Sequence, residues 1–105
     1  MRDDDVGAVF SALGDATRRQ VIRCLNEEGE MTATELAARL PVTRQAIAKH
    51  LATLSDAGLV DADKEGRELR YRLTPQPLTD AMGWMADVGA EWDARLRRLQ
   101  RYLSS

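Results

Sequence analysis

The chain has 105 residues, of which 44% are hydrophobic and 30% charged, a size and composition typical of one small globular domain. No stretch approaches the roughly 20 apolar residues of a transmembrane helix, and the N-terminal Met-Arg-Asp-Asp-Asp lacks the apolar region of a secretion signal. A single cysteine, Cys24, excludes an internal disulfide and suits a reducing compartment. We therefore expect one domain over residues 1–105, without a membrane partner, in the cytoplasm.

The net charge of the chain argues at first against a nucleic-acid partner. It is −2 at pH 7, whereas domains that bind nucleic acids are usually basic. The charges are unevenly spread, however. Residues 1–38 hold 4 Lys/Arg against 8 Asp/Glu, residues 39–72 hold 7 against 5, and residues 73–105 hold 4 against 4. The small basic excess in the middle third permits DNA binding but does not demonstrate it.

The first part of the chain predicts two helices. Residues 6–13 repeat apolar side chains at i, i+3, i+4 and i+7, and Gly14 ends this segment. Asp15 suits the N-cap of a second helix, because its carboxylate can accept free backbone N–H groups of a first turn. Gly29 closes that helix. Its predicted buried face consists of Val21, Ile22 and Leu25.

Two short helices joined by a tight turn follow. Thr32-Ala33-Thr34-Glu35 matches a capping box, in which the first and last side chains each bind the other residue's backbone N–H. Pro41 stops the first helix, and Thr43 is an N-cap for the second, which we expect to run to about Ala57. Residues 33–57 therefore have the helix-turn-helix pattern. The predicted buried face of the second helix consists of Ile47, Leu51 and Leu54.

After Gly58 the apolar period changes from helical to alternating, which is typical of strands. Gly66-Arg67 suits a two-residue type II′ turn, so residues 60–73 are predicted to form a β-hairpin, the wing. The register that follows places apolar residues opposite apolar ones and acids opposite bases. The predicted pairs are Val60–Leu73, Ala62–Tyr71, Asp61–Arg72 and Asp63–Arg70.

Pro75 and Pro77 mark the entry to a last helix at about 77–103. Its apolar residues recur at alternating spacings of four and three, the heptad pattern of a helix that packs against another helix. Packing on its own core is one possibility. The other helices already fill the core of so small a domain, so we expect a two-fold dimer interface shared with the first helix. The predicted interface residues are Val6, Val9, Phe10, Leu78, Met82, Met85, Trp92, Leu96 and Leu99.

The expected fold is mainly α with a small β-hairpin wing, in the order α-α-α-α-β-β-α, a winged helix-turn-helix that dimerises through its terminal helices. Five motifs in this order carry a family resemblance: Ala12–Arg19, Thr34–Ala37, Val42–Leu51, Leu54–Val60 and Gly66–Leu73. With them the chain resembles the ArsR/SmtB family of bacterial transcriptional regulators over about residues 6–103. Ala16 departs from the pattern, since the family commonly has proline there. The resemblance implies a homodimeric DNA-binding regulator.

We expect this regulator to repress its own or a neighbouring promoter by binding a pseudo-palindromic double-stranded operator. An α-helix fits the major groove, and the first turns of the second helix present side chains that suit base edges, such as Gln45 for adenine. His50, beside the core face, is expected to pack. Arg70 and Arg72 fit cross-strand pairing as well as they fit DNA contact. The candidate DNA-binding residues are Thr43, Arg44, Gln45, Ala48, Lys49, Lys64, Arg67 and Arg70.

No cofactor, metal site or catalytic residue is expected. Metal sensors of the family carry cysteines on the helix that reads Glu35–Leu40 here, or His and Asp ligands on the closing helix, which has no histidine here. Cys24 is expected to be a core thiol, with redox sensing as the alternative. No nucleophile–base pair or phosphate loop points to an enzyme. The alternative function is a winged-helix module that binds proteins and not DNA, which the acidic total charge favours.

Overall fold

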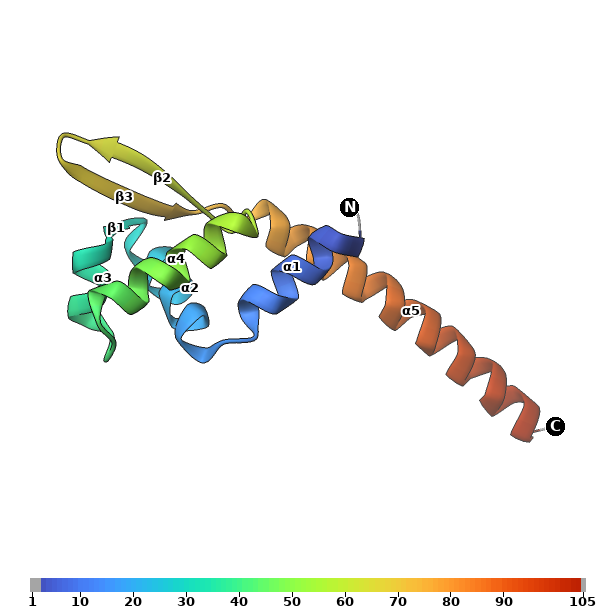
Figure 1. The fold of residues 1–105 in the computed structure, drawn as a ribbon. Coiled ribbons are helices and arrows are strands. Elements are labelled where there is room, and N and C mark those ends of the chain that lie inside the picture. Colours follow the sequence, from blue (N-terminus) through green and yellow to red (C-terminus); the bar gives the residue numbers. More distant parts are fainter. Residues whose placement is uncertain (1–2, 105) are drawn as a thin grey trace.

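The computed structural model describes residues 3–104 and follows the expected order of elements with one addition, a short strand before the third helix (Figure 1). The helix-turn-helix pair packs beside the sheet, the wing extends at one end of the molecule, and the last helix leads away at the other (Figure 1). The elements are α1 (Asp3–Leu13), α2 (Ala16–Glu28), β1 (Glu30–Thr32), α3 (Ala33–Arg39), α4 (Arg44–Asp56), β2 (Val60–Glu65), β3 (Glu68–Leu73) and α5 (Gln76–Ser104).

The expected N-caps start the three central helices. Asp15 and Thr43 each accept the backbone N–H three residues on, at 3.0 and 3.1 Å. At α3 the capping box is complete: Thr32 Oγ1 accepts the Glu35 N–H at 3.1 Å, and Glu35 Oε1 accepts the Thr32 N–H at 2.9 Å. Each cap satisfies an N–H group that has no partner within its helix. The second helix of the helix-turn-helix therefore begins where the sequence predicts.

The sheet has three antiparallel strands in the order β1-β3-β2. The sequence did not predict β1, because three residues are too few to display an alternating pattern. The strand forms where the chain between α2 and α3 meets the free edge of β3, with Met31 opposite Tyr71. This third strand attaches the wing to the start of the helix-turn-helix.

The wing hairpin has the predicted register, from Val60 opposite Leu73 to the residues that flank the turn. Gly66 has a φ of 62°, whereas no residue other than glycine has a positive φ in the described chain. A positive φ at the first turn residue alone is the geometry of a type II′ turn, which suits the right-handed twist of the strands. The turn chemistry therefore sets the pairing of the strands.

The core lies where α1 to α4 meet the sheet and the first turns of α5. Leu36 of α3 and Ile47 of α4 are completely buried there, and Cys24 of α2 packs in the same cluster. The expectation that Cys24 is a core thiol is therefore confirmed. Helix α4 buries its predicted apolar face and exposes the opposite one. The core thus holds α4 by one side.

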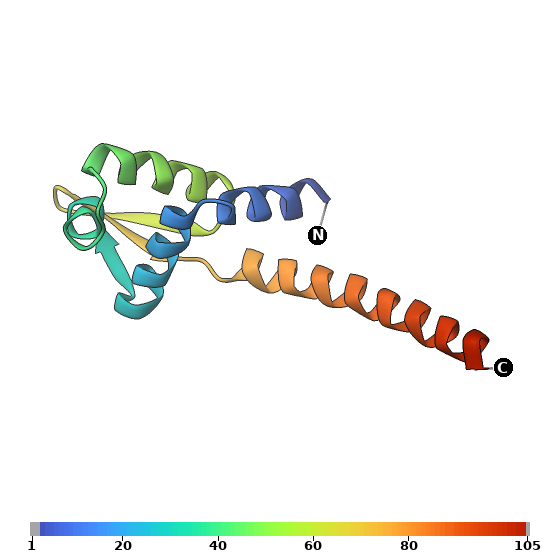
Figure 2. The ribbon, with the colours of Figure 1, turned by 90° about the horizontal axis from the view of Figure 1, so that it is seen from below.

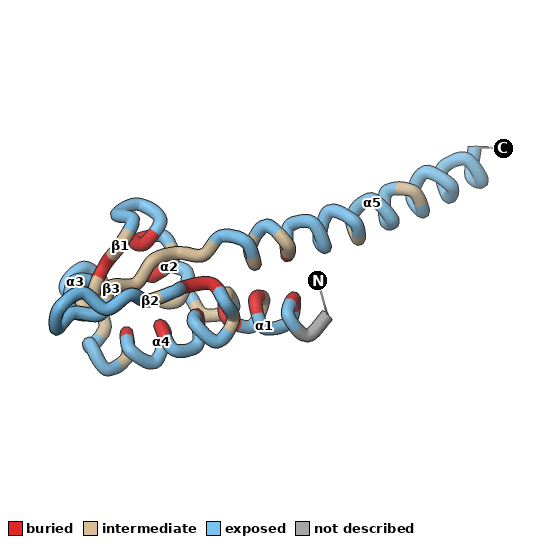
Figure 3. The backbone as a smooth tube through the Cα atoms, turned by 90° about the horizontal axis from the view of Figure 1, so that it is seen from above, coloured by how far each residue is buried: buried red, intermediate tan, exposed pale blue. Residues whose placement is uncertain are grey.

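Helix α5 makes the molecule elongated. The radius of gyration is 18.4 Å, whereas a compact chain of this length has about 13 Å. Most of α5 projects beyond the other elements, and along its length only Ala81 is buried (Figures 2 and 3). Although α5 is long, neither it nor any other helix within residues 3–104 is apolar enough to cross a membrane.

Two residues predicted for the dimer interface are already buried within a single protomer. Val6 and Val9 are 4% and 1% exposed within one chain, because α1 packs on α5, α2 and α4. Phe10, beside them, is partly buried, and its ring meets Trp84 edge-on with centroids 5.9 Å apart. Periodicity identifies an apolar face but not the element that covers it, and for Val6 and Val9 the covering elements belong to the same chain.

Candidate nucleic-acid interface

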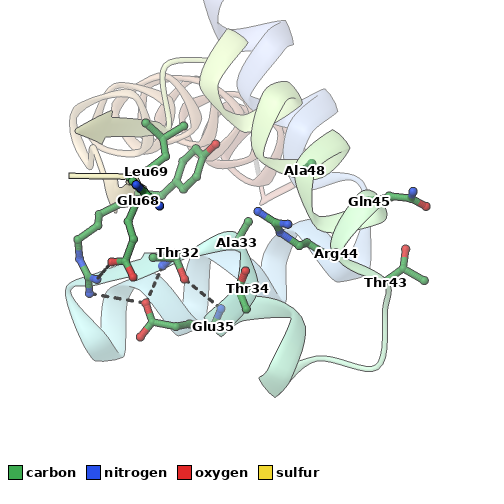
Figure 4. A pocket seen from close by; sticks show the side chains of 13 residues that line it. Thr32, Ala33, Thr34, Glu35, Thr43, Arg44, Gln45, Ala48, Glu68 and Leu69 are labelled. Atoms are coloured by element: carbon green, nitrogen blue, oxygen red, sulfur yellow. Dashed lines mark hydrogen bonds and ion pairs between the residues drawn. The ribbon is translucent and has the colours of Figure 1, made fainter. Parts of the chain in front are cut away.

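A groove of about 1030 Å³ lies between the start of α4, the start of α3 and the wing strand β3 (Figure 4). Its walls combine elements that are distant in the sequence, so no local pattern could have shown it. The lining residues are Thr32–Glu35, Thr43–Gln45, Ala48 and Arg67–Tyr71.

Helix α4 brings most of the predicted reading residues to this groove. Thr43, Arg44, Gln45 and Ala48 line it, and Lys49 is exposed next to them without lining it. No acidic residue lies in the first turn of α4. The free N–H groups and positive dipole end of that turn therefore favour an anion such as a phosphate.

The tip of the wing carries two exposed cations. Arg67 follows Gly66 in the turn and lines the groove, and Lys64 lies on β2 opposite Leu69. Neither Lys64 nor Arg67 forms an ion pair within residues 3–104. Their charges are therefore available to an outside anion.

Arg70 has a different environment from the other candidates, although it lines the same groove. Its guanidinium lies 3.2 Å from Glu68, 3.6 Å from Glu30, 3.6 Å from Glu35 and 3.9 Å from Glu65. The sequence left two alternatives open for Arg70, pairing with acids across the strands and contact with DNA. These contacts favour pairing with acids.

Arg72, the second arginine of β3, is also paired with acids. It lies 3.2 Å from Glu30 and 3.8 Å from Asp61, and it donates a hydrogen bond to Asp63. The hydrogen bond and charge of Asp63 raise the pKa of the Arg72 guanidinium. Asp63 lies opposite Arg70 in the register, as predicted, but bonds to Arg72. The predicted register of the strands was therefore correct. The prediction that Asp63 pairs with the arginine directly opposite it was wrong, because Asp63 bonds to Arg72.

The start of α3 is part of the groove that sequence reasoning missed. The capping box marked a helix start but gave no sign that the wing would lie beside it. Glu35 has its pKa lowered, chiefly because it accepts the backbone N–H and side-chain hydroxyl of Thr32, and less so by the charge of Arg70. Glu35 therefore carries a stable negative charge at the edge of the groove.

His50 and Cys24 lie outside the groove. His50 is half-buried on α4, and its charge contributes to the lowered pKa of Asp15, whose main cause is the hydrogen bond from the Arg18 N–H. In residues 3–104, no three His, Cys, Asp or Glu side chains are grouped so that they could hold a metal ion.

Comparisons with known proteins agree with this geometry. Residues 13–62 match a family described as a helix-turn-helix domain. An uncharacterised HTH-type transcriptional regulator of Bacillus subtilis, YuzN, is 44% identical over 85 residues, which cover 74% of this chain and 92% of that protein. The arsenical resistance operon repressor of Escherichia coli is 36% identical over 93 residues, 88% of this chain and 76% of that protein. A solved ArsR-like transcriptional regulator from Rhodococcus sp. RHA1 has a TM-score of 0.86 and 43% identity, covering 93% of this chain and 92% of that one.

Proposed function

Because the chain belongs to the ArsR family of helix-turn-helix transcriptional regulators, we propose that it is a homodimeric repressor of its own or a neighbouring promoter. It binds DNA as a transcriptional regulator, and it represses by occupying a pseudo-palindromic operator and blocking polymerase. The observation that carries the proposal is the exposed, polar start of α4, which shares one groove with the wing.

In this proposal α4 enters the major groove and reads base edges with its first turns. Gln45 bonds adenine, and Arg44 or Lys49 bonds guanine or a phosphate. The wing tip approaches the neighbouring phosphates or the minor groove with Lys64 and Arg67. These four cations and the one amide side chain are all exposed, while the opposite face of α4 is buried in the core.

The exposed apolar seam of α5 supports the homodimer. Exposed large apolar side chains that share one helix face mark an interaction surface, and a heptad spacing suits a second helix. A two-fold dimer presents two copies of α4, whose half-sites lie one helical turn apart, roughly 34 Å. The predicted interface residues that are exposed in the single chain are Met82, Met85, Trp92, Leu96 and Leu99.

The experiment measures binding to duplex DNA that flanks the gene, with Gln45→Ala, Lys49→Ala and the parent. Each substitution should weaken operator binding by about 1–3 kcal/mol, because a good contact to a base edge is lost. Thr53→Ala, an exposed change further along α4, is the matched control and should leave affinity unchanged. All variants should remain folded dimers. Unchanged affinity in both test variants, or a parent without sequence preference, would refute the proposal.

Salt dependence gives an independent measure of the interface. If a dimer neutralises 6–10 phosphates, operator affinity should fall roughly 10³–10⁵-fold between 50 and 200 mM salt. Fluorescence anisotropy with a labelled operator measures this slope. An affinity that is flat in this range would indicate a contact of another kind.

We further propose that the repressor is released by something other than a metal ion bound at the family's metal sites. The relevant part of α3 reads Glu35–Leu40 without cysteine, and α5 contains no histidine. Operator binding should therefore be the same with added zinc, added arsenite or a chelator. A shift of the binding curve by any of the three would contradict this part of the proposal.

A further inference from the structure

The arginines of β3 lie within a cluster of acids that comes from four elements. Arg70 and Arg72 together are paired with one carboxylate from β1, one from α3, three from β2 and one from β3. We call this cluster the carboxylate cage. Its six acidic residues are Glu30, Glu35, Asp61, Asp63, Glu65 and Glu68.

The remaining cations of the DNA-facing surface are not held in this way. Within residues 3–104, no ion pair involves Arg44 or Lys49 of α4, or Lys64 or Arg67 of the wing. The cage, by contrast, sets six carboxylates against two guanidinium groups and so carries a net charge of about −4 when all its groups are ionised. The wing therefore carries two cations without an ion pair in the described residues, Lys64 and Arg67, beside a cluster whose net charge is negative.

This distribution has a direct consequence for binding to a polyanion. A phosphate that approaches Arg70 comes within the Debye length, about 10 Å at 0.1 M salt, of every carboxylate around it, so their repulsion is only weakly screened. The carboxylates lie 3.2 to 3.9 Å from the Arg70 guanidinium. Sequence-independent affinity for DNA comes from cations that replace counterions on phosphates. An arginine already neutralised by acids adds little to that term.

We propose that the carboxylate cage withholds Arg70 and Arg72 from the DNA phosphates and thereby acts as a specificity determinant. It restricts the sequence-independent attraction of the wing to Lys64 and Arg67 at the tip, and it leaves discrimination to the base contacts of α4. The inference rests on the proposed function, because it concerns how a repressor separates its operator from other DNA.

The test removes carboxylates of the cage that the fold does not need. Glu65→Gln/Glu68→Gln removes two of the four carboxylates around Arg70 and leaves intact the capping box at Glu35 and the attachment of β1 at Glu30. Binding to a mixed-sequence duplex should tighten roughly tenfold at 0.1 M salt, and the slope of log K against log[salt] should steepen by about 1.8, the value for one added phosphate contact from each protomer of the dimer. The ratio of operator to mixed-sequence affinity should fall.

Two further variants separate the cage from a simple change of net charge. Glu65→Gln/Glu68→Gln/Arg70→Gln should lose the gain in affinity and slope, because the released guanidinium is then absent. Glu27→Gln/Glu28→Gln is the matched control: it removes two charges and releases Arg39, which does not line the groove. It should change the slope far less than the cage variant does.

The outcomes distinguish the cage from the function on which it rests. An unchanged salt slope in Glu65→Gln/Glu68→Gln overturns the proposed role of the carboxylate cage. A gain in affinity that persists after Arg70→Gln, or that the Glu27→Gln/Glu28→Gln control also shows, overturns it as well. Operator preference in the parent is measured separately. If the parent shows no operator preference, the proposal that the protein is a repressor is refuted. A gain in mixed-sequence affinity that depends on Arg70 would still support the proposed role of the carboxylate cage.

Discussion

Short polar side chains decide where the helices of the DNA-binding part begin. Asp15, Thr32 and Thr43 each lie in the extended conformation just before a helix and accept an N–H from its first turn. The bond satisfies a donor that would otherwise lack a protein partner. For Thr43 the cap also sets the residue at which α4 starts, and hence which side chains occupy the first turns that we propose read the bases.

The first residue-scale prediction concerns the capping box. Thr32→Ala removes the acceptor of the Glu35 N–H and should lower the free energy of unfolding by roughly 1 kcal/mol. Urea denaturation followed by circular dichroism measures the change. Thr34→Ala, an exposed substitution in the same helix turn, should have a much smaller effect. Equal losses in the two variants would mean that the cap contributes nothing specific.

The second prediction concerns acid. Asp15 and Glu35 have pKa values lowered from ordinary values of 3.8 and 4.5 by hydrogen bonds that only the folded chain provides. Because the folded chain holds these protons less tightly, their stabilisation is complete above the ordinary values and is lost as pH falls through the lowered ones. Unfolding free energy should therefore decline below about pH 4.5. Asp15→Asn/Glu35→Gln should flatten that decline, and an identical acid profile would contradict the assignment.

At the scale of elements, the wing is the part whose geometry depends most on one turn. The hairpin carries Arg67 at its tip, and its β3 strand forms one wall of the groove. Strand β1 pairs with the other edge of β3 and leads directly into α3, so the sheet joins the wing to the helix-turn-helix. The position of the tip relative to α4 therefore follows from the register of two strand pairs.

The element-scale prediction tests the turn. Gly66 has a φ of 62°, which costs an L-residue roughly 1–2 kcal/mol unless its side chain is Asn or Asp. Gly66→Ala should lower stability by about that amount and weaken DNA binding by displacing Arg67, whereas Gly66→Asn should be tolerated better. Thermal unfolding and operator affinity measure the two effects. A fully stable Gly66→Ala variant would show that the turn has another geometry.

At the scale of the whole molecule, α5 is far longer than the core requires. Its 29 residues extend for about 44 Å, and the part beyond Ala81 exposes a row of large apolar side chains. Trp92, 56% exposed, is partly covered by the Arg95 guanidinium 5.4 Å from its ring centroid. The other large apolar side chains of α5 beyond Ala81 that are exposed lie between 42% and 79% exposed, which fits a surface that a second protomer completes.

The molecule-scale prediction separates assembly from folding. Leu96→Glu should convert the dimer to a monomer and sharply weaken operator binding, because a charge is placed in the apolar seam. Since Leu96 is 52% exposed in one chain, the stability of the protomer itself should change little. Ala90→Glu adds the same charge on the opposite side of the helix and should preserve the dimer. Sedimentation velocity measures the oligomeric state of both variants. A Leu96→Glu variant that remains a dimer would show that the interface lies elsewhere.

The sequence by itself determined the caps, the ends and the buried face of α4, the type II′ turn and the register of the wing. Each of these depends on residues within four positions of one another or on a turn of two residues, so the local pattern contains the interaction. The family resemblance then supplied the function. The candidate reading residues at the start of α4 followed from the same local pattern.

Only the tertiary structure decided which partners the side chains meet. Val6 and Val9 show the same periodicity whether α5 or a second protomer covers them, and their burial followed from how α1 packs. The strand β1 exists because β3 offers it an edge. Arg70 has its carboxylates on four different elements, and its charge is available or withheld according to how those elements meet. Electrostatic and apolar contacts between distant segments depend on distance in space, which the local pattern does not contain.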